Sequence, residues 1–307
     1  MKLLPLLFLG LVNMGSLNMT QLPDFDTLWN YSNPSETRVK FEELLPKAKE
    51  SGDHSYYLQL LTQIARTYSL ESNFVKAHEI LDEVEKEKTQ DLTLVEVRYL
   101  LERGRTFNSN NKKETAFPLF VSAFDLGKSN SFDYFAVDAA HMASIAAANL
   151  ELKKQWAYTG IEYAEGSEDV KVQKWLGALH NNLGWDYHEN KEYTKALELF
   201  EKALFYHNKY GNSQSQFIAK WTVARCKRSL GLFDEALTIQ LELKTEMERS
   251  DNLDGYVYEE LAEIYYAKNE LNISKPYFLK AYELLSKDSW FVANETERLN
   301  RLKELSK

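Results

Sequence analysis

The stretch NNLGWDYHENKEYTKALELFEKAL, residues 181–204, places small, aliphatic and aromatic residues at helical spacing on both sides of the polar turn HENKE. This spacing predicts two helices, each with one apolar face. The packing positions are Leu183, Gly184 and Tyr187 in the first helix, and Ala196, Phe200 and Ala203 in the second. A glycine inside a helix costs about 1 kcal/mol relative to alanine. We therefore expect Gly184 to lie where the two helices approach closely, so that packing offsets its cost.

Other parts of the chain carry a small residue in the position of Gly184. These residues are Ala65, Gly104, Ala224 and Ala262. Because alanine occurs there as well as glycine, the position requires a small side chain rather than a left-handed backbone. We therefore predict that Gly184→Ala is tolerated and that Gly184→Leu is not.

The pattern of two helices recurs along the chain at a nearly constant interval. The small residue of the second helix falls at Ala77, Ala116, Ala157, Ala196, Ala236 and Ser274. Successive members are therefore 39, 41, 39, 40 and 38 residues apart. A helical pair of this kind has an apolar face that it cannot bury alone, and stacked neighbours bury it in a continuous core. The repeat predicts an all-α protein.

These residues resemble the tetratricopeptide repeat (TPR), whose signature of Leu-Gly, Tyr, Ala, Phe and Ala is almost complete between Leu183 and Ala203. The repeats run to about 40 residues instead of 34, and in this they are similar to those of kinesin light chain and of bacterial peptide-sensing regulators. The flanks, residues 25–53 and 284–305, also resemble a widespread bacterial group of long-repeat proteins that has no assigned activity. The resemblance implies a right-handed superhelical solenoid of about six TPR-like hairpins with N- and C-terminal capping helices.

The domain division follows from the repeat. We expect an N-terminal capping helix in residues 24–52, the six-repeat solenoid in 53–287 and a C-terminal capping helix in 288–307. Residues 1–23 contain an apolar run that is too short to span a bilayer. They are interpreted either as a signal peptide or as a segment before the true start at Met14 or Met19. Because no A-x-A-like cleavage site follows, the sequence favours the cytoplasm, with export to the periplasm or medium as the alternative.

Composition and motifs argue against several kinds of chemistry. A formal net charge of -9 over 307 residues disfavours a nucleic-acid binder, which needs a concentrated basic face. The single cysteine, Cys226, cannot form an intrachain disulfide. His180 and His188 are two helical turns apart, too far to hold one metal ion together. Because no catalytic or cofactor motif is recognisable, we expect neither an enzyme nor a bound cofactor or metal.

The candidate binding residues come from the first helix of each repeat, because the resemblance implies that these helices line the concave surface. The principal candidates are Asn181, Asn182, Trp185, Trp221, Arg225, Arg66 and Arg105. A wider set adds Gln63, Arg98, Met142, Asn149, Arg228, Glu259 and Glu263. Asn182 precedes the Leu-Gly pair, where an asparagine often bonds the peptide backbone in peptide-binding repeats of the resembled families. The alternative is that the tryptophans only pad the inner wall and the arginines pair with neighbouring glutamates.

These observations predict a non-catalytic scaffold that binds a protein or peptide segment in the concave surface, with an acidic segment favoured by the arginines. The full basic set of a carboxylate clamp is missing, so a chaperone adaptor is not expected. The alternative is a regulator in which a short peptide changes the curvature of the solenoid. Known regulators of this type generally carry a further module, and Asp24 to Gly52 is too short for a helix-turn-helix domain plus a first repeat. The partner and the oligomeric state stay open.

Overall fold

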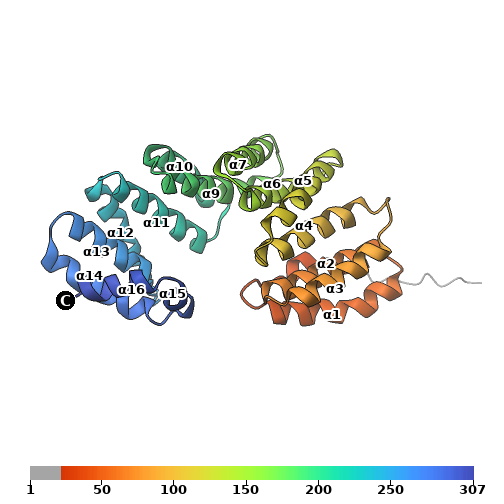
Figure 1. The fold of residues 1–307 in the computed structure, drawn as a ribbon, viewed down its shortest axis with the longest axis horizontal. Coiled ribbons are helices and arrows are strands. Elements are labelled where there is room, and N and C mark those ends of the chain that lie inside the picture. The colour runs from red at the N-terminus through yellow and green to blue at the C-terminus, as the bar shows by residue number, and fades with distance from the viewer. Residues whose placement is uncertain (1–21) are drawn as a thin grey trace, which may run out of the picture. The chain divides into compact units, whose positions relative to one another are not determined.

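The structure, a computed structural model, describes residues 22–307. Every regular element in this range is a helix, which confirms the all-α prediction. The signal-peptide and alternative-start hypotheses concern residues outside the described range. Two compact units divide the chain, residues 22–95 (unit 1) and residues 96–307 (unit 2). Figure 1 labels the helices of both units.

Unit 1 holds the helix that is predicted to cap the N-terminal end, and the first hairpin. Its elements are η1 (Phe25–Leu28), α1 (Pro34–Ser51), α2 (His54–Leu70), α3 (Phe74–Glu87) and the first residues of α4 (Thr93–Ser109). The side chains of Asn33, Asp53 and Asn73 each accept a backbone N–H at the start of the helix that follows. Such caps satisfy donors that a helix cannot pair internally. The three polar residues therefore set where α1, α2 and α3 begin.

Unit 2 contains the remaining hairpins in chain order. They are α4 with α5 (Lys113–Ser129), α6 (Asp133–Ala146) with α7 (Leu150–Glu165), α9 (Trp175–Glu189) with α10 (Tyr193–Tyr210), α11 (Ser213–Ser229) with α12 (Phe233–Arg249), and α13 (Gly255–Ala267) with α14 (Leu271–Leu285). The short α8 (Val170–Gln173) precedes α9, and α15 (Ser289–Asn294) and α16 (Thr296–Leu305) close the chain. Together with the hairpin of unit 1, these are the six TPR-like hairpins that the repeat predicts. The division into capping and solenoid domains stays a prediction.

Most hairpins close with the same turn. One residue adopts positive φ, and the next donates its backbone N–H to the carbonyl five residues before it. The positive-φ residues are Ser72, Asn111, Lys191, Gly231 and Asn269, and the five hydrogen bonds are each 2.9 Å long. This is the 6→1 bond of a Schellman ending. The turn between α6 and α7 differs, since the side chain of Asn149 caps α7 there by accepting the backbone N–H of Leu152.

The predicted packing register is confirmed in the core. All six small residues of the second helices are buried, and Phe120, Phe200 and Phe278 are among the largest fully buried side chains. In the fifth hairpin Gln240 takes the place of these aromatic residues. It is also completely buried, and neither polar atom of its amide has a hydrogen-bond partner.

The structure argues against the expectation that Gly184→Ala is tolerated. Gly184 lies inside α9 against α10, as predicted, but a Cβ atom there would come within 2.5 Å of Cε1 of Phe200. Gly104 has the same relation to Phe120, at 2.6 Å. Because both rings are fully buried, they have little room to move away. At these two positions a methyl group would therefore require the phenylalanine ring to shift.

Candidate functional site

The first helices of unit 2 form one continuous face, which we call the first-helix face. It consists of α4, α6, α9, α11 and α13. In Figure 1, α6 and α9 lie on one side of unit 2, and the second helices α7 and α10 lie on the other. Side chains about one repeat apart in sequence join neighbouring first helices. At the start of the face, Arg105 of α4 forms ion pairs with Glu102 of its own helix and with Asp138 of α6.

Asparagines stand in the middle of the face. The amide nitrogen of Asn182 lies 2.8 Å from Nε2 of His141 on α6, and the amide nitrogen of Asn181 donates to the amide oxygen of Asn182 at 3.3 Å. Burial lowers the pKa of His141, and this outweighs the nearby Asp138 carboxylate, which raises it. His141 is therefore neutral at pH 7, and its Nε2 atom can accept a hydrogen bond from the amide nitrogen of Asn182.

A row of aromatic side chains continues along the face. We define the aromatic row as Trp185 of α9, Trp221 of α11 and Tyr256 of α13. The ring centroids of Trp185 and Trp221 are 6.4 Å apart, and those of Trp221 and Tyr256 are 6.2 Å apart. The indole nitrogen of Trp221 donates to the backbone carbonyl of Tyr256 at 3.3 Å, which fixes its ring. All three side chains pack against the buried core but stay partly exposed, so the row has an accessible surface.

The arginines beside the aromatic row are held by a carboxylate. Arg228 of α11 donates to both oxygens of Glu260 of α13, at 2.7 and 3.1 Å, and Arg225 lies 3.2 Å from the same group. Burial raises the pKa of Glu260, while the charge of Arg228 lowers it. Two guanidinium groups share one carboxylate, so this cluster keeps one excess positive charge when Glu260 is ionised.

The acids at the far end of the face pair with the last helix. Arg298 of α16 donates to both oxygens of Glu259, each at 2.6 Å, and Arg301 forms a second ion pair with Glu263. The guanidinium of Arg298 also lies 5.6 Å from the centre of the Tyr256 ring. The two acids predicted to line the groove, Glu259 and Glu263, therefore bind the last helix, α16, through its arginines.

The structure brings most of the predicted site residues together. Asn181, Asn182 and Trp185 share α9, and Trp221 and Arg225 lie on the adjacent α11. Arg105 lies two first helices earlier, on α4 of the same unit. Arg66 belongs to unit 1, where its guanidinium lies 5.6 Å from the ring of Trp29 and 5.3 Å from that of Tyr31.

Residues of the wider predicted set have other roles. Gln63 is buried and accepts a hydrogen bond from the indole nitrogen of Trp29 at 3.2 Å. Asn149 caps α7, a second helix, by accepting the backbone N–H of Leu152. The buried Arg98 places its guanidinium over the ring of Phe135, 4.7 Å from the ring centre. Periodicity alone does not separate such residues from those that face outward.

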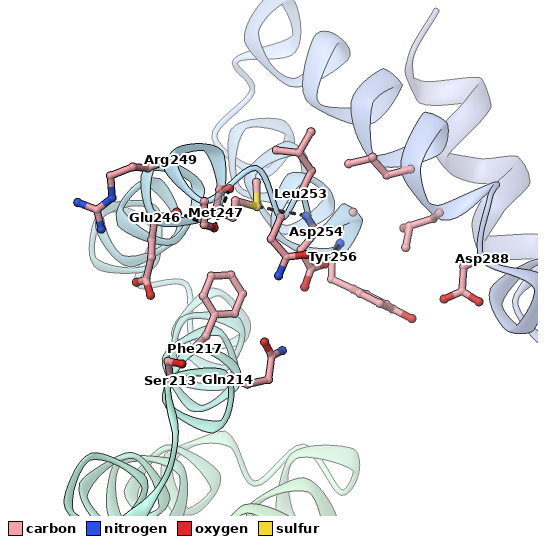
Figure 2. A pocket seen from close by; sticks show the side chains of 15 residues that line it. Ser213, Gln214, Phe217, Glu246, Met247, Arg249, Leu253, Asp254, Tyr256 and Asp288 are labelled. Atoms are coloured by element: carbon pink, nitrogen blue, oxygen red, sulfur yellow. Dashed lines mark hydrogen bonds between the residues drawn. The ribbon is translucent and has the colours of Figure 1, made fainter. Parts of the chain in front are cut away.

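A cavity at the helix ends of unit 2 was not anticipated from the sequence. It has a volume of about 720 Å³ and opens between the start of α11, the end of α12, the start of α13 and the start of α15. Phe217, Met247 and Tyr256 contribute apolar wall, and Asp254 and Asp288 contribute carboxylates (Figure 2). These residues come from separate helix ends and share no spacing, so no pattern in the sequence could identify them as a set.

Two further properties of the described residues concern metal ions and membranes. Among residues 22–307, no group of three histidine, cysteine or acidic side chains is arranged to hold a metal ion. Within the same range, none of the helices combines the length and the apolar character that crossing a bilayer requires.

Comparison with known proteins identifies the fold. The sequence matches no protein-family model and no curated protein. Among solved structures, the apo form of RapI is 15% identical, with 86% of this chain and 76% of RapI covered at a TM-score of 0.66. A signal-transduction ATPase with a tetratricopeptide repeat sensor from Pyrococcus horikoshii is 15% identical, with 90% of this chain and 44% of the ATPase covered at a TM-score of 0.68. NprR in complex with its cognate peptide NprX is 15% identical, with 92% and 82% covered at a TM-score of 0.52.

These likenesses confirm the predicted TPR-like fold. At such low identity they establish the fold alone. Membership of a bacterial group of long-repeat proteins stays a prediction.

Proposed function

We propose that this TPR-like protein is a non-catalytic scaffold that binds a segment of another protein on the first-helix face of unit 2. The observation that carries the proposal is the aromatic row, in which Trp185, Trp221 and Tyr256 extend over three consecutive repeats and stay partly exposed. Rigid aromatic side chains supply contact area at low entropic cost and are enriched among the residues that dominate binding energy. The similar fold of NprR, which was solved with its cognate peptide, supports this choice.

Polar groups beside the aromatic row suit a segment in extended conformation. Asn181 and Asn182 stand one helical turn before Trp185, and an asparagine amide can both donate to and accept from a peptide backbone. Their contacts with each other and with His141 leave part of this capacity unused. The segment would then be held by backbone hydrogen bonds at α9 and by side-chain contacts along the row.

An acidic residue in the segment fits one place. The cluster of Arg225, Arg228 and Glu260 keeps one excess positive charge, and it lies on the same helices as Trp221 and Tyr256. Of the two arginines, Arg225 has the more exposed side chain. The proposed preference for an acidic partner therefore rests on Arg225, which shares the Glu260 carboxylate with Arg228.

A peptide-responsive regulator is the second candidate. Ion pairs between successive first helices, such as that of Arg228 with Glu260, favour it, because a ligand that lies across several first helices could change their spacing. In this version the same face binds a short peptide, and the output is a change in the spacing of the first helices of unit 2. Small-angle X-ray scattering with and without a bound peptide separates the candidates, since a plain scaffold keeps its scattering profile.

The proposal is tested with a library of random dodecapeptides displayed on phage, selected on the full chain. We expect the selected peptides to bind the Trp185→Ala/Trp221→Ala variant at least about 100-fold more weakly, because contacts of this kind contribute 2 kcal/mol or more each. Phe205→Ala is the matched control, since Phe205 is 59% exposed but lies on the second helix α10. Peptides that bind wild type and the double variant equally would refute the proposal.

A further inference from the structure

The cavity between α11 and α13 has the size and walls of a ligand site. Its volume of about 720 Å³ lies within the range of roughly 300–1,000 Å³ that is typical of small-molecule pockets. Phe217 of α11 and Tyr256 of α13 supply aromatic wall, and Met247 and Leu285 close the apolar part. These four residues belong to four helices, α11, α12, α13 and α14, and Figure 2 labels Phe217, Met247 and Tyr256 among the side chains that line the cavity. A flat or aliphatic group of several carbons can be buried there.

The charges at this cavity are mainly negative. Its lining holds three carboxylates, those of Glu246, Asp254 and Asp288, and one cation, Arg249. Glu246 is already 3.4 Å from Lys220, and Figure 2 shows Arg249 directed away from the other labelled side chains. Asp254 and Asp288 are therefore the charges that a ligand would meet.

Both aspartates retain acceptor capacity. Asp254 caps α13 by accepting the N–H of Tyr256 at 2.7 Å, and Asp288 caps α15 by accepting the N–H groups of Trp290 and Phe291 at 2.9 and 3.1 Å. A carboxylate offers about four acceptor sites, so each cap leaves room for a further donor. Burial raises the pKa of the Tyr256 phenol, and both aspartates raise it further against the opposing effect of Arg298, so both carboxylates act on this ring.

We propose that this cavity binds a basic side chain, arginine or lysine, of the protein segment that lies on the aromatic row. The methylene stem packs between Phe217 and Tyr256, and the cationic head pairs with a carboxylate of the lining, that of Asp254 or that of Asp288. Tyr256 belongs both to the aromatic row and to the cavity, so a segment that reaches the end of the row arrives at the cavity. That the occupant is part of a protein rests on the proposed function, whereas the preference for a cation rests on the cavity alone.

The test uses two small probes on the full chain, N-acetyl-L-arginine amide and the uncharged N-acetyl-L-citrulline amide, which has nearly the same shape. Binding is followed by NMR chemical shifts of unit 2 at low salt. We expect the arginine probe to bind about tenfold more tightly, because charge-assisted hydrogen bonds contribute more than neutral ones. Asp254→Asn/Asp288→Asn should abolish this difference while keeping both helix caps, since asparagine is an equally good N-cap.

The matched control is Asp53→Asn, which changes a capping aspartate of α2 in unit 1 and should leave the preference intact. Equal affinity for the two probes, or a preference that survives the double substitution, overturns the inference. The outcome is separable from that of the phage selection. If the selected peptides depend on Trp185 and Trp221 but the two probes bind equally, the proposed function is supported and the basic-residue site is refuted. If the peptides bind the double tryptophan variant equally but the arginine probe is preferred, the charge preference of the cavity is supported and the proposed function is refuted.

Discussion

Gly184 of α9 lies so close to Phe200 of α10 that a Cβ atom on the glycine would come within 2.5 Å of the ring. We expect Gly184→Ala to destabilise the protein by about 1–2 kcal/mol, because the cost of overpacking exceeds the gain in helix propensity. Gly184→Leu should prevent folding of this hairpin. Urea unfolding followed by circular dichroism measures both.

A control for Gly184→Ala is Gly166→Ala, where the new Cβ would make only an ordinary contact of 3.5 Å. It should be close to neutral. The double variant Gly184→Ala/Phe200→Leu tests the cause directly, since a smaller side chain at position 200 should make Gly184→Ala less costly. If Gly184→Ala costs the same in both backgrounds, Phe200 is not the source of the effect.

Gln240→Leu should stabilise unit 2. The Gln240 side chain is 0% exposed and neither polar atom of its amide has a hydrogen-bond partner, so folding removes these atoms from water without compensation. Removing an unsatisfied buried polar group is expected to raise the free energy of unfolding by about 1–3 kcal/mol. The same exchange at the exposed Gln155 should change it by less than about 0.5 kcal/mol. A lower melting temperature for Gln240→Leu would contradict the assignment.

Arg228→Ala should destabilise unit 2 strongly. Glu260 is 1% exposed, and the substitution removes its bidentate partner while the contact with Arg225 remains. We expect a loss of about 3 kcal/mol, the lower end of the cost of breaking a buried ion pair. Lys244→Ala, which removes an exposed pair with Glu248, should cost no more than about 0.5 kcal/mol. Equal unfolding midpoints for the two variants would show that the Glu260 cluster contributes nothing to stability.

Stability should depend on pH through His180. Its ring is 1% exposed and lies 2.8 Å from the carbonyl of Leu176, and burial lowers its pKa despite that hydrogen bond. Below the unfolded pKa of about 6.5, the unfolded chain binds a proton that the folded chain resists. The contribution of the neutral His180 ring to the free energy of unfolding is therefore complete above pH 6.5 and is lost as the pH falls.

The pH effect is measured by comparing wild type with His180→Phe in thermal unfolding at pH 7.5, 6.5 and 5.5. Wild type should be the more stable at pH 7.5, and its advantage should shrink toward pH 5.5. A difference that stays constant over this range would mean that His180 does not titrate differently in the two states.

Cys226 should be unreactive in the folded protein. Its thiol is 0% exposed, it donates to the backbone carbonyl of Tyr193 at 3.4 Å, and burial raises its pKa to about 11. Thiolate is the reactive form, so little is available at pH 8. A thiol reagent such as 5,5′-dithiobis(2-nitrobenzoic acid) should label it only in denaturant. Rapid labelling without denaturant would show that α11 opens locally.

The amino-acid sequence by itself determined the repeat. The spacing from Ala77 to Ser274 and the signature between Leu183 and Ala203 identify six helical hairpins, because an apolar face at helical spacing can be buried only against its neighbours. The position of Gly184 between paired helices follows from the same pattern. Candidate residues on the first helices follow as well, since periodicity assigns each position to a face.

Only the tertiary structure decided what those positions contact. Arg228 meets Glu260, 32 residues away, and Asp254 and Asp288 line one cavity together with residues at the start of α11. Whether an arginine is free or paired, and whether Gly184 has room for a methyl group, depends on differences of about an ångström in the distances between side chains of separate helices. A repeat period cannot encode such distances, because they result from the packing of every side chain between the helices at once.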